Sequence, residues 1–80
     1  MKTNVYITLK QGVLDTQGKA IGNALHGLGF DQVNDVRQGK FIELDIDATG
    51  ADEAKQLASA MCEKLLANMV IEDYKIEVAA

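Results

Sequence analysis

The stretch from Gly12 to Ala20, GVLDTQGKA, contains the residue types of a phosphate-binding loop. Such a loop follows the pattern G-x-x-x-x-G-K-[ST], in which backbone N–H groups wrap the phosphates and the last hydroxyl binds Mg²⁺. Here five residues rather than four separate Gly12 from Gly18, and Lys19 is followed by an alanine, which has no hydroxyl. Asp15 would also place a carboxylate inside the cradle. We therefore interpret the stretch as a corner between a strand and a helix, with Asp15 capping the helix.

The other reactive side chains do not assemble into a catalytic group. Cys62 is the single cysteine, so neither an internal disulfide nor a Cys-x-x-Cys metal site can form, and its place on an apolar stripe predicts core packing. His26 has no identifiable nucleophile to activate and is predicted to lie on a helix surface. Asp45 and Asp47 are expected on one strand face, about 7 Å apart, as solubilising or partner-facing charges. The sequence thus predicts no catalytic, cofactor-binding or metal-binding residue.

Size and charge restrict the class of protein. The chain has 80 residues, of which 48% are hydrophobic and 25% charged, and its formal net charge is −4. This length predicts one domain, residues 1–80, with a core so small that self-association is expected. The acidic balance argues against nucleic-acid binding. No apolar run approaches the length of a membrane span, so we expect no membrane partner and a cytoplasmic location.

Hydrophobic spacing predicts six elements, in the order strand, helix, strand, strand, helix, strand. Residues 4–10 alternate as in a half-buried strand, and residues 21–28 repeat at helical spacing. Residues 32–47 are predicted to form two strands joined by a turn at Gly39. A helix opened by ATGADEA follows, and residues 70–78 alternate again.

This order favours an α+β fold of the ferredoxin-like type. Right-handed crossovers give a four-stranded antiparallel βαββαβ sandwich with both helices on one face. The other sheet face would be open and would carry Tyr6 and Phe41, either as an interface or as two rings on a solvated surface. An RNA-binding use of these rings is disfavoured because acidic residues follow Phe41 on its face.

Glycines and charges gather at the predicted turns, which is where binding residues commonly lie on a rigid scaffold. Gly18 and Gly22 are four residues apart on one helix face, either tolerated there or required by close packing against another backbone. The candidate partner-interface residues are Lys10, Gly12, Asp15, Lys19, Asp35, Arg37, Gly39, Lys40, Tyr6 and Phe41.

Four segments carry a resemblance to a known family: LKQGVLDTQGKAI, LGF, DVRQGKFIEL and MCEKLLANMVIEDYKIE. In this order and with these gaps, the chain from Val5 to Glu77 resembles the PurS family, the small subunit of phosphoribosylformylglycinamidine synthase. The family usually has proline where this chain has Thr16 and Met69. Because proline commonly marks helix ends, these two departures concern local rigidity.

The resemblance implies an accessory role in purine biosynthesis. It implies a homodimer, with a tetramer left open, in complex with a large ATP-dependent synthetase subunit and a glutaminase subunit. The glutaminase would release ammonia, and the synthetase, with ATP and Mg²⁺, would use it to make formylglycinamidine ribonucleotide. The small subunit would bridge the two and assist ammonia transfer, with no cofactor of its own.

Two other classes share the strand order. An amino-acid-sensing regulatory domain of the ACT type has a similar strand–glycine–helix entry and is the main alternative. A small enzyme of the acylphosphatase type would need an arginine in the loop after the first strand, and KQGVLDTQGK contains none.

Overall fold

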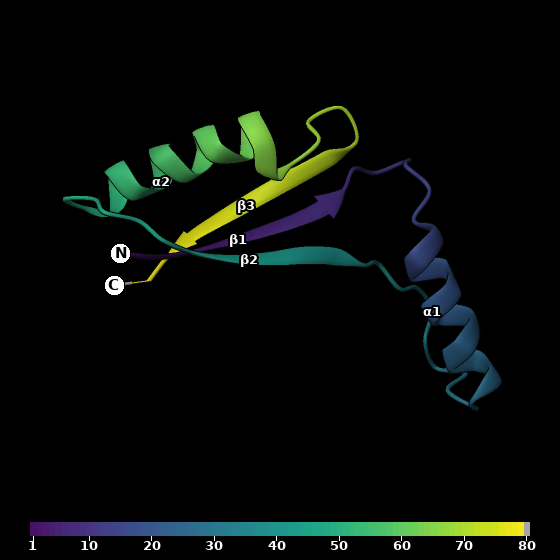
Figure 1. Ribbon diagram of the computed structural model, residues 1–80. Coiled ribbons are helices and arrows are strands. Elements are labelled where there is room, and N and C mark those ends of the chain that lie inside the picture. The colour runs from purple at the N-terminus through teal and green to yellow at the C-terminus, as the bar shows by residue number, and fades with distance from the viewer. Residues whose placement is uncertain (80) are drawn as a thin grey trace.

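The computed structural model describes residues 1–79, which form two parts (Figure 1). The first part, here called the body, contains the strands β1 (Lys2–Leu9), β2 (Gly39–Asp45) and β3 (Glu72–Val78) and the helix α2 (Ala51–Met61), which a π-helical turn (Cys62–Leu66) extends. The second part, here called the arm, spans residues 11–38 and contains the helix α1 (Thr16–Gly27). The arm projects beyond one end of the sheet (Figure 1).

The sheet has three antiparallel strands in the order β2-β1-β3. Val5 of β1 lies opposite Ile42 of β2 and Ile76 of β3. Because side chains alternate along a strand, these three residues face α2, whereas Tyr6 and Phe41 lie on the opposite face. Neither helix of residues 1–79 covers that face (Figure 1), as the sequence predicted.

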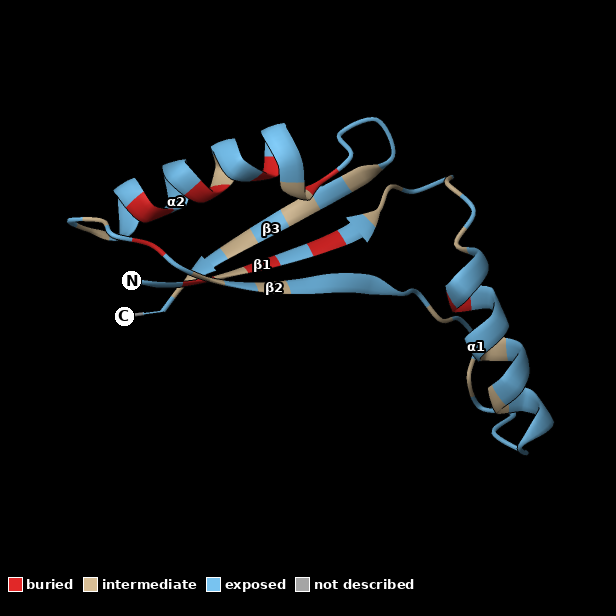
Figure 2. Ribbon diagram, viewed as in Figure 1, coloured by how far each residue is buried: buried red, intermediate tan, exposed pale blue. Residues whose placement is uncertain are grey.

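The core lies between β1 and α2 (Figure 2). Val5 and Ile7 are fully buried, and the small side chains of Ala54 and Ala58 let α2 approach the sheet closely. Cys62 belongs to the same cluster, which confirms its predicted place in the core. Burial raises the pKa of the Cys62 thiol, with a smaller contribution from Glu63.

Three details of the predicted sandwich are wrong. The sheet has three strands rather than four, because the segment before Gly39 returns along α1 as turns and coil. The apolar residues of that segment, Val33 and Val36, are three positions apart, so they cannot share one face of a strand, whose period is two. Only α2 covers the sheet; α1 does not. Finally, β2 ends at Asp45, so Asp47 lies beyond the strand.

The resulting shape is elongated. The radius of gyration is 15.8 Å and the principal extents are 49 × 27 × 14 Å, whereas a compact domain of this length has a radius near 12 Å. The excess comes from the arm, because extensive packing between helices and strands involves the body alone. Within residues 1–79, no helix has the length and hydrophobicity that a membrane crossing requires.

Candidate partner-binding site where the arm joins the body

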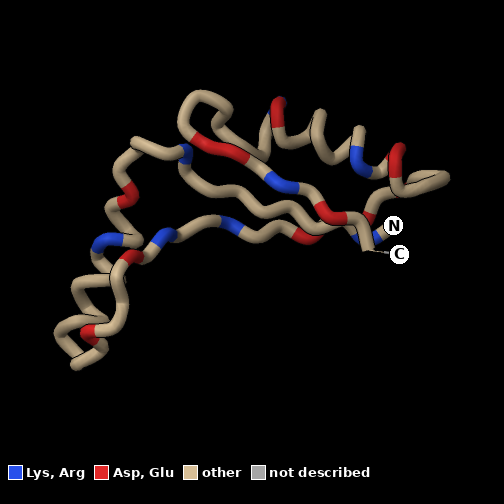
Figure 3. Tube along the Cα trace, turned by 180° about the vertical axis from the view of Figure 1, so that it is seen from behind, with Lys and Arg blue, Asp and Glu red and all other residues tan. Residues whose placement is uncertain are grey.

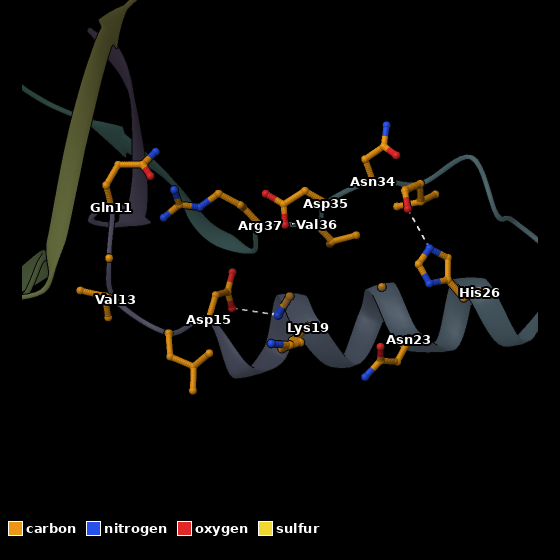
Figure 4. A pocket seen from close by; sticks show the side chains of 15 residues that line it. Gln11, Val13, Asp15, Lys19, Asn23, His26, Asn34, Asp35, Val36 and Arg37 are labelled. Atoms are coloured by element: carbon orange, nitrogen blue, oxygen red, sulfur yellow. Dashed lines mark hydrogen bonds between the residues drawn. The ribbon is translucent and has the colours of Figure 1, made fainter.

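A pocket of about 390 Å³ lies between α1 and the segment that returns along it (Figure 4). Its walls come from the loop before α1, from one side of α1 and from the returning segment. Five of the candidate residues predicted from the sequence line it: Gly12, Asp15, Lys19, Asp35 and Arg37.

Asp15 fixes the geometry of this pocket. Its Oδ1 accepts a hydrogen bond from the backbone N–H of Gly18 at 2.8 Å, so Asp15 caps α1 as predicted. Its Oδ2 accepts a second bond from the N–H of Gln38 at 2.7 Å. One carboxylate thus holds the two ends of the arm together. These bonds, from Gln38 first and Gly18 second, and the charge of Arg37 lower the pKa of Asp15.

The glycine face of α1 packs closely against the returning backbone. A Cβ on Gly18 would lie 2.5 Å from the carbonyl oxygen of Val36 and 2.5 Å from Oδ2 of Asp15. A Cβ on Gly22 would lie 3.5 Å from Cγ2 of Val36, which is an ordinary contact. Close packing therefore accounts for Gly18, while Gly22 only lies beside the same residue. The carboxylate at the start of α1 occupies the place where a phosphate loop would hold its ligand.

The other polar groups hold the arm in its extended position. Arg37 donates a hydrogen bond from its guanidinium to the carbonyl oxygen of Leu9, at the end of β1. His26 Nε2 lies 2.7 Å from the carbonyl oxygen of Val33, across the pocket (Figure 4). Lys19 makes no ion pair within residues 1–79. It is the one Lys, Arg, Asp or Glu within α1.

The remaining candidates lie outside this pocket. Gly39 and Lys40 line a smaller neighbouring cavity of about 160 Å³ that also contacts Asp15, and Lys40 pairs with Glu72 at 3.7 Å. The main chain N–H of Lys10 bonds to the carbonyl of Ile71 at 2.8 Å, beside the body.

Tyr6 and Phe41 form a separate feature on the open sheet face. Their ring centroids are 5.1 Å apart, with the planes tilted by 31°. Charged residues surround them, including the pairs Lys2–Glu43 at 3.8 Å and Lys75–Glu77 at 3.2 Å. This face is therefore mostly polar, with one aromatic pair at its centre.

Five residues that line the larger pocket were not among the candidates predicted from the sequence. They belong to α1 and to the returning segment. They are Asn23, His26, Val33, Asn34 and Val36. The spacing of three between the valines does not fit the period of a strand and is the signal that could have set this segment apart from one. Among residues 1–79, no three His, Cys, Asp or Glu side chains converge as metal ligands do.

Comparison with known proteins places the chain in a family. Residues 2–80 match the family described as PurS, phosphoribosylformylglycinamidine (FGAM) synthase. The PurS subunit of Bacillus subtilis is 52% identical over 77 residues, which cover 96% of this chain and 90% of that protein.

Solved structures agree over the arm as well as the body. The crystal structure of Methanocaldococcus jannaschii PurS matches with a TM-score of 0.90 at 42% identity, covering 98% of this chain and 94% of that one. The structure of PurLQS from Thermotoga maritima matches with a TM-score of 0.87 at 29% identity, covering 95% of this chain and 93% of that one. None of these matches supports the amino-acid-sensing alternative, and the resemblance stated from the sequence is confirmed. The chain belongs to the PurS family of phosphoribosylformylglycinamidine synthase subunits.

Proposed function

We propose that this chain bridges a glutaminase subunit and an ATP-dependent synthetase subunit in a phosphoribosylformylglycinamidine synthase complex and assists the transfer of ammonia between them. The related protein of Bacillus subtilis is named as a subunit of this synthase, and the Thermotoga maritima structure is described as PurLQS. ATP and Mg²⁺ would belong to the synthetase partner, and the complex would act in the cytoplasm.

The observation that carries this proposal is the arm. Arg37 joins the arm to the body through a hydrogen bond to the carbonyl of Leu9, and Asp15 joins the two ends of the arm through a bond from the N–H of Gln38. A projecting arm with a polar pocket is suited to contact with another protein, because it presents turn and helix residues beyond the end of the sheet. The reactive side chains are also consistent with a binding role. His26 contacts the carbonyl oxygen of Val33, and Cys62 is buried.

We also propose that the chain self-associates. An 80-residue chain with a radius of gyration of 15.8 Å buries less of its surface than a compact domain of that length, and small domains are already marginal. A homodimer is the smallest assembly that would cover the exposed surface, and a tetramer is compatible with the same reasoning.

Reconstitution from three purified subunits tests the bridging role. Free ammonia at high concentration bypasses transfer between subunits, so omission of this chain should reduce glutamine-driven synthesis more than ammonia-driven synthesis. Equal losses with both nitrogen sources would mean that the chain supports the synthetase site directly. No loss with either source would contradict bridging.

A charge reversal in the pocket locates the contact. Lys19→Glu should produce the same asymmetry between nitrogen sources, because Lys19 lies in the pocket and pairs with no carboxylate of residues 1–79, and like charges disfavour docking. Reversal of Arg37 and Lys40 tests the same turn, although both side chains also make internal contacts. Lys55→Glu, on an exposed position of α2, is the matched control and should leave both reactions unchanged.

A further inference from the structure

The open sheet face, on the side of the sheet away from α2, carries exposed aromatic surface at its centre. Tyr6 and Phe41 lie opposite each other in the register of β1 and β2, and they are 36% and 53% exposed. Their rings contact each other with centroids 5.1 Å apart. Neither helix of residues 1–79 covers them (Figure 1). The pair is therefore available to another molecule, and aromatic side chains are enriched where proteins meet.

A row of hydrogen-bond acceptors lies beside the aromatic pair. Asn4 of β1 is aligned with Glu43 of β2 on one side and with Glu77 of β3 on the other. All three share the open face with Tyr6, because side chains alternate along a strand. The side-chain oxygen of Asn4 is buried, yet it has no hydrogen-bond partner among residues 1–79. Buried polar atoms are normally paired, so this acceptor row lacks a donor.

Carboxylates outnumber cationic groups on this face, and acidic residues lie along both β2 and β3 (Figure 3). The register places on it Glu43, Asp45, Asp73 and Glu77 against Lys2, Lys75 and the α-amino group of Met1, which pairs with Asp45 at 3.4 Å. The two lysines pair with Glu43 and Glu77, and all four of these side chains are at least half exposed. Exposed ion pairs contribute little to stability, so a partner's cation can replace either lysine. Asp73 makes no ion pair within residues 1–79.

An arginine side chain matches both the aromatic pair and the acceptor row. The guanidinium is planar, has five N–H donors and no acceptor, and stacks on aromatic rings. Two residues along a strand span about 7 Å, which is the spacing from Phe41 to Glu43. A guanidinium stacked on the rings therefore has the carboxylate of Glu43 within reach of its N–H groups. A lysine ammonium cannot stack in this way, and a nucleic acid would bring its phosphates against the carboxylates.

We propose that the open sheet face binds an exposed arginine on a basic surface of one partner subunit, with the guanidinium stacked on the Tyr6–Phe41 pair and paired with Glu43. This rests on the bridging role proposed above and adds to it, because a bridge needs two contact surfaces and the pocket of the arm supplies one. Lys19 gives that pocket a positive charge, whereas the open face has an excess of carboxylates, so the two surfaces favour partner surfaces of opposite charge. The net charge of −4 also attracts a basic partner at long range.

Titration of the labelled chain with each purified partner subunit, in the presence of glutamine, ATP and Mg²⁺, tests this surface. Phe41→Leu keeps an apolar side chain but removes the ring, and it should weaken the binding of one subunit by roughly two- to thirtyfold. Glu43→Gln keeps the shape and removes the charge. It should weaken the binding of the same subunit, and its difference from the parent should shrink at high salt. The matched controls are Leu65→Ala, at a residue that is 83% exposed, and Glu63→Gln, at an exposed carboxylate; both should bind as the parent does.

Chemical footprinting identifies the side chain that the partner contributes. Phenylglyoxal modifies exposed arginines, and mass spectrometry locates the modified positions. The parent chain and Glu63→Gln should each protect an arginine of the subunit that Phe41→Leu binds weakly. Protection of lysines alone against acetylation, with no arginine protected against phenylglyoxal, would overturn the proposal.

Sedimentation distinguishes a partner subunit from a second copy of this chain as the molecule that covers the open face. Phe41→Leu should self-associate as the parent does; reduced self-association would show that a second copy covers the face and would overturn the proposal. A parent chain that binds neither subunit would contradict the bridging role and this inference with it. A parent chain that binds both subunits, together with Phe41→Leu and Glu43→Gln variants that bind both equally tightly, would contradict only the arginine site.

Discussion

The body and the arm place similar side chains in different environments. In the body, Val5 and Ile7 are fully covered by α2, within 1% of complete burial. In the arm, Ile21 is 40% exposed and Leu28 is 74% exposed, and most of α1 is exposed (Figure 2). Hydrogen bonds through Asp15 and Arg37 determine the position of the arm, whereas hydrophobic packing determines the position of α2. The structure of the body therefore depends mainly on its own core. The structure of the arm depends on these hydrogen bonds and on the surface that covers its apolar side.

The largest expected effect comes from the core of the body. Ile7→Ala removes a fully buried side chain and should cost about 2–5 kcal/mol of unfolding free energy. A core of this size supplies only about 3–5 kcal/mol, so the variant should be largely unfolded. In dilute protein, Ile21→Ala in the arm should change stability by about 0.5 kcal/mol or less. Urea unfolding measures both; equal losses would mean that arm and body share one core.

A glycine pair tests whether close backbone packing holds the arm together. Gly18→Ala places a Cβ 2.5 Å from two oxygen atoms, and it should separate α1 from the returning segment at a cost of about 1–3 kcal/mol. Gly22→Ala introduces only an ordinary contact and gains helix propensity of about 1 kcal/mol. The protection of the α1 amides against hydrogen exchange should decrease in Gly18→Ala and increase in Gly22→Ala. The reverse order would contradict this view of the arm.

The pH dependence of the arm should follow Asp15. Its folded pKa lies below the ordinary value of 3.8 because the N–H groups of Gln38 and Gly18 bond to the ionised carboxylate. The stabilisation is therefore fully present above pH 3.8 and is lost as pH falls through the lower folded value. NMR spectra of α1 should show this loss in the parent chain and not in Asp15→Asn. Asp31→Asn is the control and should behave as the parent does.

The smallest effect is expected at the start of α1. Thr16 is the first helical residue, where proline has a suitable φ and its missing N–H is not needed by the helix. Thr16→Pro should be neutral or stabilising by up to about 1 kcal/mol, through the unfolded chain. A large fall in melting temperature would show that the corner requires the Thr16 N–H. The corresponding change at Ser59, inside α2, should strongly destabilise the body.

The elements of the body were predictable because each depends on a local pattern. The alternation around Val5 and Ile7 predicts β1, and the position of Cys62 on an apolar stripe predicts its burial. Asp15 was identified as a cap from its place before the helical repeat. In each case, the pattern lies within one short continuous segment of the sequence.

The position of the arm was not predictable from such patterns. A strand–helix–strand order is equally compatible with α1 over the sheet or beyond it, and the difference depends on hydrogen bonds made by Arg37 and Asp15 to residues more than 20 positions away. The pocket has the same origin, because its walls come from two segments. Candidates such as Lys19 and Asp35 could be chosen by type, but their meeting in one pocket could not.

The central claim is that the arm relies on another chain for its stability, whereas the body relies on its own core. Amide hydrogen exchange at two protein concentrations tests this claim most directly. The measurement compares α1 with β1 in the parent chain, well above and well below the concentration at which it dissociates. Dilution should remove most of the protection of α1 and change that of β1 much less. Protection of α1 that is independent of concentration and equal to that of β1 would contradict the account.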